Sequence, residues 1–333
     1  MLSRLANDAV DPLITLMYRL RRNPRLRKFI IDARNRNIFV TLDQHERMLS
    51  DQLRVDIYHR AISKQVKQGD VVVDLGTGTG VLSFFAAAQD PKKIYAIDHS
   101  NIIETARTVA QYNGIRSIEF LKTSSKDFAP AEKVNVLIHE QMGQNLFDEG
   151  IVHNICDLRD RILTRDGCII PGRFSLFMEP VRLKDAYRIP HVSELNLHGV
   201  RFDCLRERTT EENSLRTLHP HQAEALLCDP EPVLQLDFRS LDPSTLPDRF
   251  SFRKRITNPG RMDGVCVYWT AHFDDELAIS TSPLAPHTHW GSWFMRTHTQ
   301  EYDAGTELEF AWTIGELTEI RSWRYTLRTL AAG

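Results

Sequence analysis

The stretch that decides the fold reads Val71-Val-Val-Asp74-Leu-Gly76-Thr-Gly78-Thr-Gly80-Val-Leu-Ser-Phe-Phe-Ala86. An apolar run leads into a glycine-rich turn, and apolar residues at helical spacing follow the turn. Glycine allows the backbone to approach a ligand closely and to adopt conformations that a Cβ forbids. A second apolar stretch, Lys93–Asp98, ends in an acid that comes 18 positions after Gly80. The order strand, turn, helix, strand predicts an α/β domain that binds a nucleoside.

The chemistry of this turn indicates a cationic nucleoside without phosphates. Asp98 can accept hydrogen bonds from both hydroxyls of an adenosine ribose. The sequence departs from the G-x-G-x-x-G of dinucleotide folds and from the phosphate loop, because no Gly-Lys-Ser/Thr follows it. One acid, Asp74, precedes the first glycine and another follows the next strand, which suits a sulfonium. We therefore expect S-adenosylmethionine as the cofactor.

Two glutamates, Glu140 and Glu149, lie nine positions apart and follow the apolar stretch Val134–Ile138. Such a run is typical of a central strand in a parallel sheet, and ligands bind beyond the carboxyl ends of these strands. A guanidinium presents paired N–H donors that a carboxylate accepts in bidentate fashion, so two carboxylates suit a guanidinium acceptor. The alternative is a pair of solvated loop acids.

Four motifs, in this order along the chain, resemble those of the protein arginine methyltransferases, and the likeness runs from about Asp43 to the C-terminus. They are the helical segment His45–Arg54, the glycine turn Asp74–Gly80, the double-glutamate loop with Met142-Gly143 between its acids, and Thr288-His289-Trp290. The resemblance implies a methyl transfer to a guanidino nitrogen of arginine in a protein or peptide.

The resemblance also implies roles for single residues. Arg54 contacts the cofactor carboxylate, and Asp51 pairs with His289. The catalytic residues it implies are Glu140, Glu149, His289 and Asp51. The acceptor-binding residues are Glu140, Met142, Glu149 and Trp290. The cofactor-binding residues are His45, Met48, Arg54, Asp74, Gly76, Thr77, Gly78, Gly80, Leu82, Asp98, His99, Ser125, Lys126, Asp127 and Glu140. No residue is expected to bind a metal ion.

Two of these roles have structural alternatives. The His289–Asp51 pair can act on a proton or shape the pocket, or it can simply hydrogen-bond two domains together. Trp290 can wall the acceptor channel or fill the core of the C-terminal domain.

Several positions depart from the family pattern. Asn35–Gln44 has no tyrosine where the family has Tyr-Phe-x-x-Tyr, and Gln141 and Gln144 replace the usual aromatic residues of the glutamate loop. Asp98 stands for the commoner Glu, and Lys126 for an acid. The chain is thus identified as a divergent member, and two other functions stay open. One is methylation of a small guanidino or amine metabolite, and the other is a catalytically weak scaffold.

Composition limits the partners and the compartment. The chain has 333 residues, 42% of them hydrophobic, and a net charge of −2, which gives no basic field for nucleic acid. Five cysteines without a C-x-x-C pair favour a reducing compartment, the cytoplasm. No run is long enough for a membrane helix, and we expect no membrane partner. The basic amphipathic stretch Leu13–Arg27 favours a helix packed on the catalytic domain over one lying on a membrane.

The pattern along the chain predicts an α/β protein with three parts. Residues 1–60 are expected to form N-terminal helices that act as a lid, and residues 61–171 a Rossmann-like class I methyltransferase domain. Residues 172–333 contain short strands between turn residues, which predict an antiparallel β-barrel that binds the substrate. The resemblance makes the insertion at about 185–230 a helical dimerisation arm, with Leu195, Phe202 and Leu205 at helical spacing. We therefore expect a homodimer.

Overall fold

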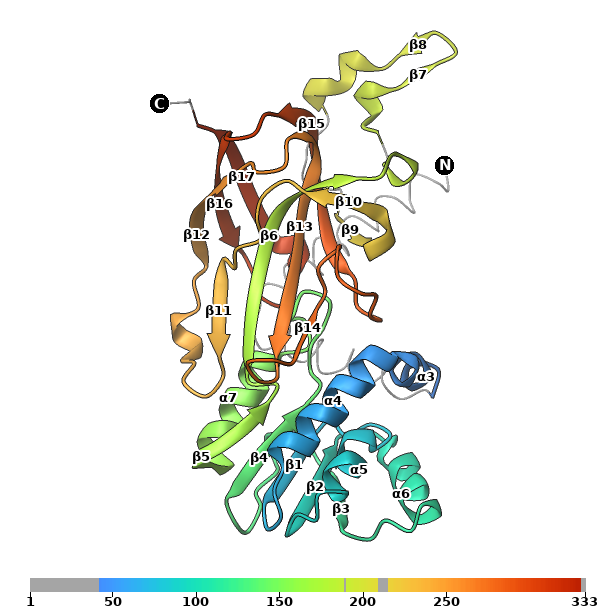
Figure 1. Ribbon diagram of the computed structural model, residues 1–333, viewed down its shortest axis with the longest axis vertical. Coiled ribbons are helices and arrows are strands. Elements are labelled where there is room, and N and C mark those ends of the chain that lie inside the picture. The colour runs from blue at the N-terminus through green and yellow to red at the C-terminus, as the bar shows by residue number, and fades with distance from the viewer. Residues whose placement is uncertain (1–41, 189, 209–214, 331–333) are drawn as a thin grey trace, which may run out of the picture.

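The computed structural model describes residues 42–188, 190–208 and 215–330. Figure 1 shows two layered parts, a parallel sheet with its helices below and a taller antiparallel part above. The predicted helix at Leu13–Arg27 and most of the segment without tyrosines lie outside the described residues. No helix of the described residues is long and apolar enough to cross a membrane.

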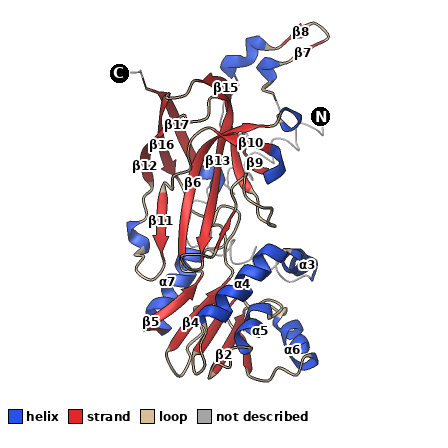
Figure 2. Cartoon of the chain, viewed as in Figure 1, coloured by secondary structure: helices blue, strands red, loops and turns tan. Residues whose placement is uncertain are grey.

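The lower part is a five-stranded parallel sheet of order β3-β2-β1-β4-β5. Its strands are β1 (Val71–Leu75), β2 (Lys93–Asp98), β3 (Ile118–Lys122), β4 (Val134–His139) and β5 (Leu163–Ile170). The α-helices that gather around this sheet in Figure 2 are α3 (Leu42–Ser50), α4 (Gln52–Gln65), α5 (Val81–Ala87), α6 (Ile103–Tyr112) and α7 (Ile151–Ile162). α4 extends past residue 60, where the lid was expected to end.

The strand order brings the two decisive sequence stretches together. Strand β1 has β2 on one side and β4 on the other, so the order reverses between β1 and β4. Leu75 and His139 are paired in register, which puts the carboxyl ends of these two strands side by side. Ligands of open α/β sheets bind at such a switch point. The glycine turn after β1 and Glu140 after β4 therefore meet at one edge of the sheet.

The upper part consists of antiparallel sheets, as the short strands predict. One has seven strands, with the path β10-β6-β13-β15-β9 and with β11 and β14 on its side branches, and the other has the order β12-β16-β17. Their strands are β6 (Arg173–Leu183), β9 (Leu215–Leu218), β10 (Ala223–Leu226), β11 (Leu234–Asp237), β12 (Arg249–Arg255), β13 (Gly260–His272), β14 (Ala278–Ser280), β15 (Ser292–Tyr302), β16 (Glu307–Ile314) and β17 (Trp323–Thr329). Among the described residues these strands form separate sheets and no closed ring.

Helix α4 connects the two parts. Its Tyr58 is fully buried in the main hydrophobic core, and its hydroxyl donates to the backbone oxygen of His139 at 2.8 Å. The same ring meets Phe273 edge-on at 4.8 Å, and Gln65 donates to the backbone oxygen of Phe273 at 2.9 Å. A single cluster of buried side chains thus continues from the parallel sheet into the antiparallel part.

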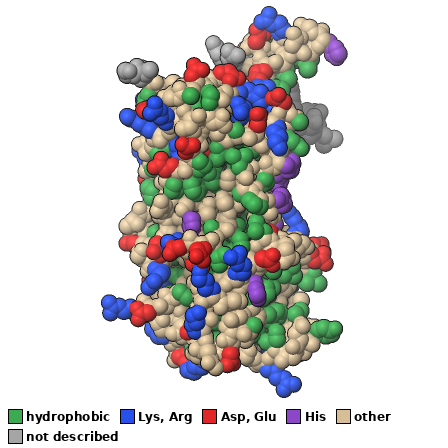
Figure 3. Space-filling view, in the orientation of Figure 1, with side chains coloured by type: hydrophobic (Ala, Val, Ile, Leu, Met, Phe, Trp, Pro, Cys, Tyr) green, Lys and Arg blue, Asp and Glu red, His purple; other side chains and the backbone are tan. Residues whose placement is uncertain are grey.

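The surface carries charges of both signs. On the face seen in Figure 3, Lys and Arg side chains are interspersed with Asp and Glu side chains over both parts of the molecule. This mixture agrees with the small net charge of −2. The described residues on this face therefore form no broad patch of one sign of charge.

The insertion projects from the top of the molecule as a small hairpin of β7 (Asn196–Leu197) and β8 (Val200–Arg201) (Figure 1). Short 3-10 helices flank it, namely η1 (Asp185–Tyr187), η2 (Val192–Glu194) and η3 (Asp203–Arg208). The helical spacing of Leu195, Phe202 and Leu205 predicted a longer helix than the described residues form. His198 and Gly199 have positive φ and turn the chain back, so a hairpin forms instead. β9 and β10 return the rest of the insertion to the seven-stranded sheet.

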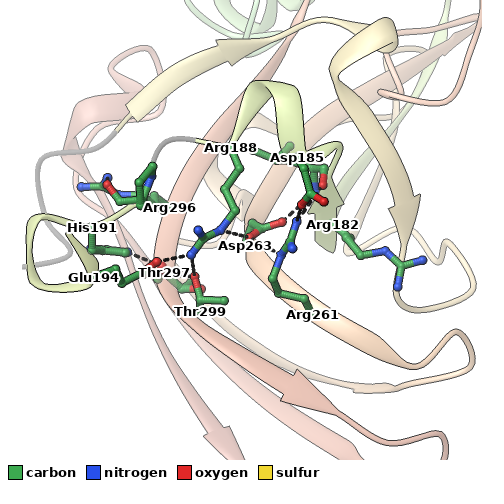
Figure 4. A network of polar contacts seen from close by, with 12 residues as sticks. Arg182, Asp185, Arg188, His191, Glu194, Arg261, Asp263, Arg296, Thr297 and Thr299 are labelled. Atoms are coloured by element: carbon green, nitrogen blue, oxygen red, sulfur yellow. Dashed lines mark hydrogen bonds and ion pairs between the residues drawn. The ribbon is translucent and has the colours of Figure 1, made fainter. Parts of the chain in front are cut away.

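A network of ion pairs anchors the base of this arm (Figure 4). The buried Asp263 on β13 accepts from the Leu183 backbone at 2.8 Å and from Arg188 Nε and Arg261 Nε at 3.1 and 3.0 Å. Arg188 also donates to Thr299 on β15 at 2.8 Å. Because the carboxylate of Asp263 is buried, its hydrogen bonds fix where the side chains of Arg188 and Arg261 lie, so the network holds the arm against the sheet.

Candidate active site

A cavity of about 670 Å³ opens at the switch point, at the carboxyl ends of the parallel strands. Eleven of the residues that the sequence proposes line it: His45, Met48, Gly76, Gly78, Asp98, His99, Ser125, Lys126, Asp127, Glu140 and Glu149. Seven further residues complete the lining: Leu75, Ile97, Lys122, Thr123, Ser124, Gln141 and Asn154. Proposed cofactor residues and proposed acceptor residues therefore share one cavity.

Asp74 lies beneath the glycine turn and is not part of the cavity lining. Its fully buried carboxylate accepts from Thr77 Oγ1 and Ser83 Oγ, both at 2.7 Å, while Oδ1 has no partner. Burial raises the pKa of Asp74 to about 6. The acid that the sequence assigned to the cofactor thus braces the turn. Gly80 and Leu82 also lie outside the cavity, at the start of α5.

The turn carries His45 above it. A Cβ at Gly78, where φ is +55°, would lie 2.8 Å from Cε1 of His45. A side chain at this position would displace His45 or force a strained backbone. The glycine therefore lets α3 close over the turn at the cavity wall.

Asp98 is held with its carboxylate at the cavity. Oδ2 accepts from the Gly78 backbone at 3.1 Å, and Oδ1 accepts from the backbone and hydroxyl of Ser100, both at 2.8 Å. These contacts fix a negative charge beside the glycine turn. A ribose with two hydroxyl donors fits such a group.

Arg54 contacts the first glutamate. Its Nη1 lies 3.2 Å from Glu140 Oε2, and its Nη2 donates to the Met48 backbone oxygen at 2.8 Å. The Nε of this buried arginine has no partner. Burial raises the pKa of Glu140, and the charges of Arg54 and His289 oppose that rise. Arg54 therefore favours the ionised form of a carboxylate whose side chain is only 14% exposed.

The predicted contact between Asp51 and His289 is present. Asp51 Oδ2 lies 2.9 Å from His289 Nδ1 and accepts from the His289 backbone at 2.8 Å, and Oδ1 caps α4 by accepting from the Arg54 backbone. Burial raises the pKa of Asp51, but the hydrogen bonds from His289 outweigh it and leave the pKa below its usual value. The pair joins α4 to the antiparallel part beside Glu140. Neither side chain belongs to the cavity lining.

Met142 and Trp290 lie outside the cavity, where Trp290 holds the glutamate loop in place through the backbone of Met142. Trp290 Nε1 donates to the Met142 backbone oxygen at 2.7 Å, and Trp269 Nε1 donates to that of Gly143 at 3.1 Å. Met142 is fully buried, Trp290 is 7% exposed, and the two indole rings meet edge-on at 5.1 Å. Their placement favours the core alternative over the expected contact with the acceptor.

The glutamate loop folds back on itself, which returns Glu149 to the cavity. Leu146 adopts a positive φ and its backbone donates to the Gly143 oxygen at 3.0 Å. Asn145 Oδ1 accepts from the backbones of Phe147 and Asp148 at 3.0 and 2.7 Å, an Asx-type turn. A Cβ at Gly143 would overlap Asp148 Oδ1, so any other residue there would force the Asp148 side chain to move. A tight turn thus explains how residues nine apart reach one cavity.

Sequence reasoning missed several lining residues. Lys122, Thr123 and Ser124 come at the end of β3, and the signal that placed Asp98 at the end of β2 applies to them equally. Gln141 was noted only as a departure from the family pattern. Asn154 carries no local signal, because its place depends on how α7 packs against the loop. A group of three or more side chains that could hold a metal ion is absent from the described part of the chain.

The strand order, the glycine turn and the carboxylate after β2 define a class I methyltransferase. Residues 58–169 match the family of ribosomal protein L11 methyltransferase (PrmA), and residues 174–326 match the arginine methyltransferase oligomerization subdomain. Among solved structures, the Trypanosoma brucei PRMT1 enzyme-prozyme heterotetrameric complex with AdoHcy has a TM-score of 0.73 and 21% identity, covering 89% of this chain and 95% of that one. This likeness shows the fold.

Curated relatives show the family. Protein arginine N-methyltransferase 6 of Danio rerio is 32% identical over 257 residues, which is 74% of this chain and 74% of the relative. Protein arginine N-methyltransferase PRMT10 of Oryza sativa subsp. japonica is 27% identical over 320 residues, covering 84% of this chain and 83% of the relative. The chain belongs to the protein arginine N-methyltransferase family.

Proposed function

We propose that the protein transfers a methyl group from S-adenosylmethionine to a guanidino nitrogen of an arginine side chain in a protein or peptide. The observation that carries this proposal is the shared cavity: Glu140 and Glu149 line it together with the glycine turn and Asp98. A cavity that holds two carboxylates, an acid suited to ribose and an open glycine backbone fits both a sulfonium nucleoside and a guanidinium.

The residues present fit the cofactor. Gly76 and Gly78 leave the backbone open toward the cavity, and Asp98 would accept from the ribose. The unpartnered, buried Nε of Arg54 leaves a donor for a carboxylate. When bound, S-adenosylmethionine supplies a methyl group activated by a positively charged sulfur.

The two glutamates solve an electrostatic problem. Donor and acceptor are both cations, and two unit charges about 4 Å apart repel by roughly 4 kcal/mol at an effective dielectric constant near 20. The carboxylates of Glu140 and Glu149 offset this repulsion. They also draw the positive charge of the guanidinium toward the nitrogens they bind, which leaves the remaining terminal nitrogen better able to attack.

Methyl transfer is then an in-line displacement. The bound cofactor would supply the methyl group, whose bond to sulfur breaks as its bond to the guanidino nitrogen forms. The proton that this nitrogen releases would go to His289 Nε2 or to water. Placement of the reacting groups supplies much of the rate. Two roles fit the His289–Asp51 pair: Asp51 holds Nδ1 so that Nε2 is the nitrogen left to receive a proton, or the pair aligns the loop with α4.

We also propose a cytoplasmic homodimer. The match to the oligomerization subdomain covers the arm, and the hairpin exposes Leu197 and Val200 at its tip. A stable pair formed through the arm should bury more than about 2,000 Å². All five cysteines are free, in keeping with a reducing compartment. Light scattering should give twice 38.4 kDa.

A direct assay separates the candidate functions. The purified protein is incubated with labelled S-adenosylmethionine and an arginine-containing peptide, the same peptide with lysine in place of arginine, or free guanidino compounds. We expect methylarginine in the first peptide only. Label in the small guanidino compounds alone would instead support a metabolite methyltransferase, and no label with intact cofactor binding would support a scaffold.

A further inference from the structure

A hydrogen bond between two side chains closes the glutamate loop on its cavity side. Asn154 Nδ2 donates to Gln141 Oε1 at 3.0 Å, and this bond joins residues 13 positions apart. Gln141 directly follows Glu140, and Asn154 lies in the helix that begins after Glu149. Both side chains are half-buried and line the cavity.

Gln141 also reaches the cofactor turn. A Cβ at Gly76 would lie 3.7 Å from Gln141 Nε2, which is van der Waals contact. The amide of Gln141 therefore stands between the first glycine of the turn and the start of α7. No other hydrogen bond of the Gln141 or Asn154 side chain is present among the described residues.

Other contacts of the loop hold it from the antiparallel part or shape its tip. Trp290 and Trp269 hold the carbonyls of Met142 and Gly143 from the antiparallel part. The bonds of Asn145 shape the tip of the loop without joining its two ends. The bond between Gln141 and Asn154 links the residue after Glu140 with the helix after Glu149 on the cavity side.

We propose that Gln141 and Asn154 are positioning residues that fix the separation of Glu140 and Glu149. This inference rests on the proposed function. A guanidinium bound by two carboxylates needs them at one spacing, because bidentate hydrogen bonds are directional. A loop closed by a side-chain amide bond helps to hold that spacing, and loss of the bond would loosen the start of α7 beside Glu149.

The test is a double-mutant cycle on the full-length protein. Gln141→Met and Asn154→Leu each remove the bond while keeping a side chain of similar size. Each should lower kcat/KM for the arginine peptide by roughly tenfold or more, because a small misplacement of reacting groups is costly. The double variant should be no worse than the poorer single one, because the bond is already lost. Exchanging the two amides keeps their combined reach, so Gln141→Asn together with Asn154→Gln should recover most of the rate.

Gln144→Met is the matched control. Gln144 is in the same loop and donates to Thr217 Oγ1 at 2.9 Å, but it does not line the cavity. The kcat/KM of Gln144→Met should stay within about twofold of the parent. This variant loses a bond between the loop and β9 but leaves the two ends of the loop linked by Gln141 and Asn154. An equal loss in this variant, or additive effects in the double variant, would overturn the proposal.

A second measurement does not depend on turnover. With S-adenosylhomocysteine bound, hydrogen exchange of the amides at 141–150 should be faster in both single variants and near that of the parent in the exchanged pair. Unchanged exchange and unchanged peptide affinity in both single variants would overturn the proposal. If the parent methylates no arginine peptide, the proposed function fails instead, and the exchange experiment still decides whether the bond closes the loop.

Discussion

At the cofactor end of the cavity the supporting contacts join residues that are close in the sequence. Asp74 accepts from two hydroxyls within nine positions, and Asp98 accepts from the Gly78 backbone 20 positions away. At the acceptor end some of the contacts join residues far apart in the sequence, since Trp290 holds the backbone of Met142 across 148 positions. The parallel sheet thus builds its own cofactor site, while the glutamate loop depends on the antiparallel part. Changes at one end should leave the other end largely intact.

The largest effect should come from the glutamates themselves. Glu149→Gln keeps the shape but removes one negative charge from the acceptor end, and turnover should fall by about a thousandfold. In Glu140→Gln, turnover should fall at least as far, and the substitution should also disturb Arg54, whose Nη1 lies 3.2 Å from Glu140 Oε2. Single-turnover rates and calorimetric cofactor affinity would be measured together. A loss of cofactor affinity in Glu149→Gln as large as the loss of rate would show that the two ends of the cavity are not independent.

At the other end, Asp74 makes stability depend on pH. Its pKa of about 6 in the folded protein exceeds the ordinary 3.8, so folding favours the protonated form. The stability that the protonated Asp74 contributes to the folded protein is fully present below pH 3.8 and is lost as pH rises through about 6. The loss amounts to about 3 kcal/mol. Asp74→Asn keeps an oxygen for Thr77 and Ser83 but cannot ionise.

Urea unfolding of both proteins at about pH 4 and about pH 7 measures this contribution. The Asn variant should gain stability relative to the parent at the higher pH, by up to about 3 kcal/mol. Parallel curves at the two pH values would show that Asp74 does not titrate as its burial implies. Because Asp74 supports the glycine turn at the cofactor end, peptide affinity should not change with pH in parallel with this stability.

Asp98→Asn tests the cofactor end directly. One oxygen becomes an amide group that cannot accept from the Gly78 backbone or from a ribose hydroxyl. A hydrogen bond to a charged group contributes about 1.5–3 kcal/mol, so cofactor affinity should fall about 10- to 100-fold. Calorimetry with S-adenosylhomocysteine checks this. An unchanged affinity would remove Asp98 from the proposed cofactor site.

Local patterns were enough to predict the strands and the glycine turn at the cofactor end. The apolar runs of β1, β2 and β4 and the glycines between β1 and α5 encode their positions within a few residues. Asp74 shows the limit of such patterns, because an acid before a glycine turn reads the same whether it faces a ligand or the core. Its full burial depends on Ser83 from the next helix.

The acceptor end could be predicted only in part. The spacing of Glu140 and Glu149 indicated a shared site, but nothing near them specifies that Trp290 and Trp269 hold the loop from outside. The arm was misread for a local reason: apolar residues at helical spacing flank His198 and Gly199, whose positive φ values make a hairpin. Contacts between residues far apart decide both cases.

The smallest effect is expected from the two tryptophans Trp290 and Trp293 of the antiparallel part. Trp290→Phe keeps an aromatic ring but removes the Nε1 donor to Met142, leaving a buried backbone oxygen without its partner. This should cost about 1–2 kcal/mol of stability and lower kcat/KM for the peptide several-fold. Trp293→Phe is the matched control, because the buried Nε1 of Trp293 has no hydrogen-bond partner to lose.

Cofactor affinity separates the possible outcomes of this pair. If the acceptor end alone depends on the antiparallel part, Trp290→Phe should weaken peptide binding while calorimetry gives a cofactor affinity close to that of the parent. Trp293→Phe should change neither. Equal losses of peptide and cofactor affinity in Trp290→Phe would show that the two ends are coupled. The hydrogen bonds of Asp98 to Gly78 and Ser100 argue for independence, because none of them involves the antiparallel part.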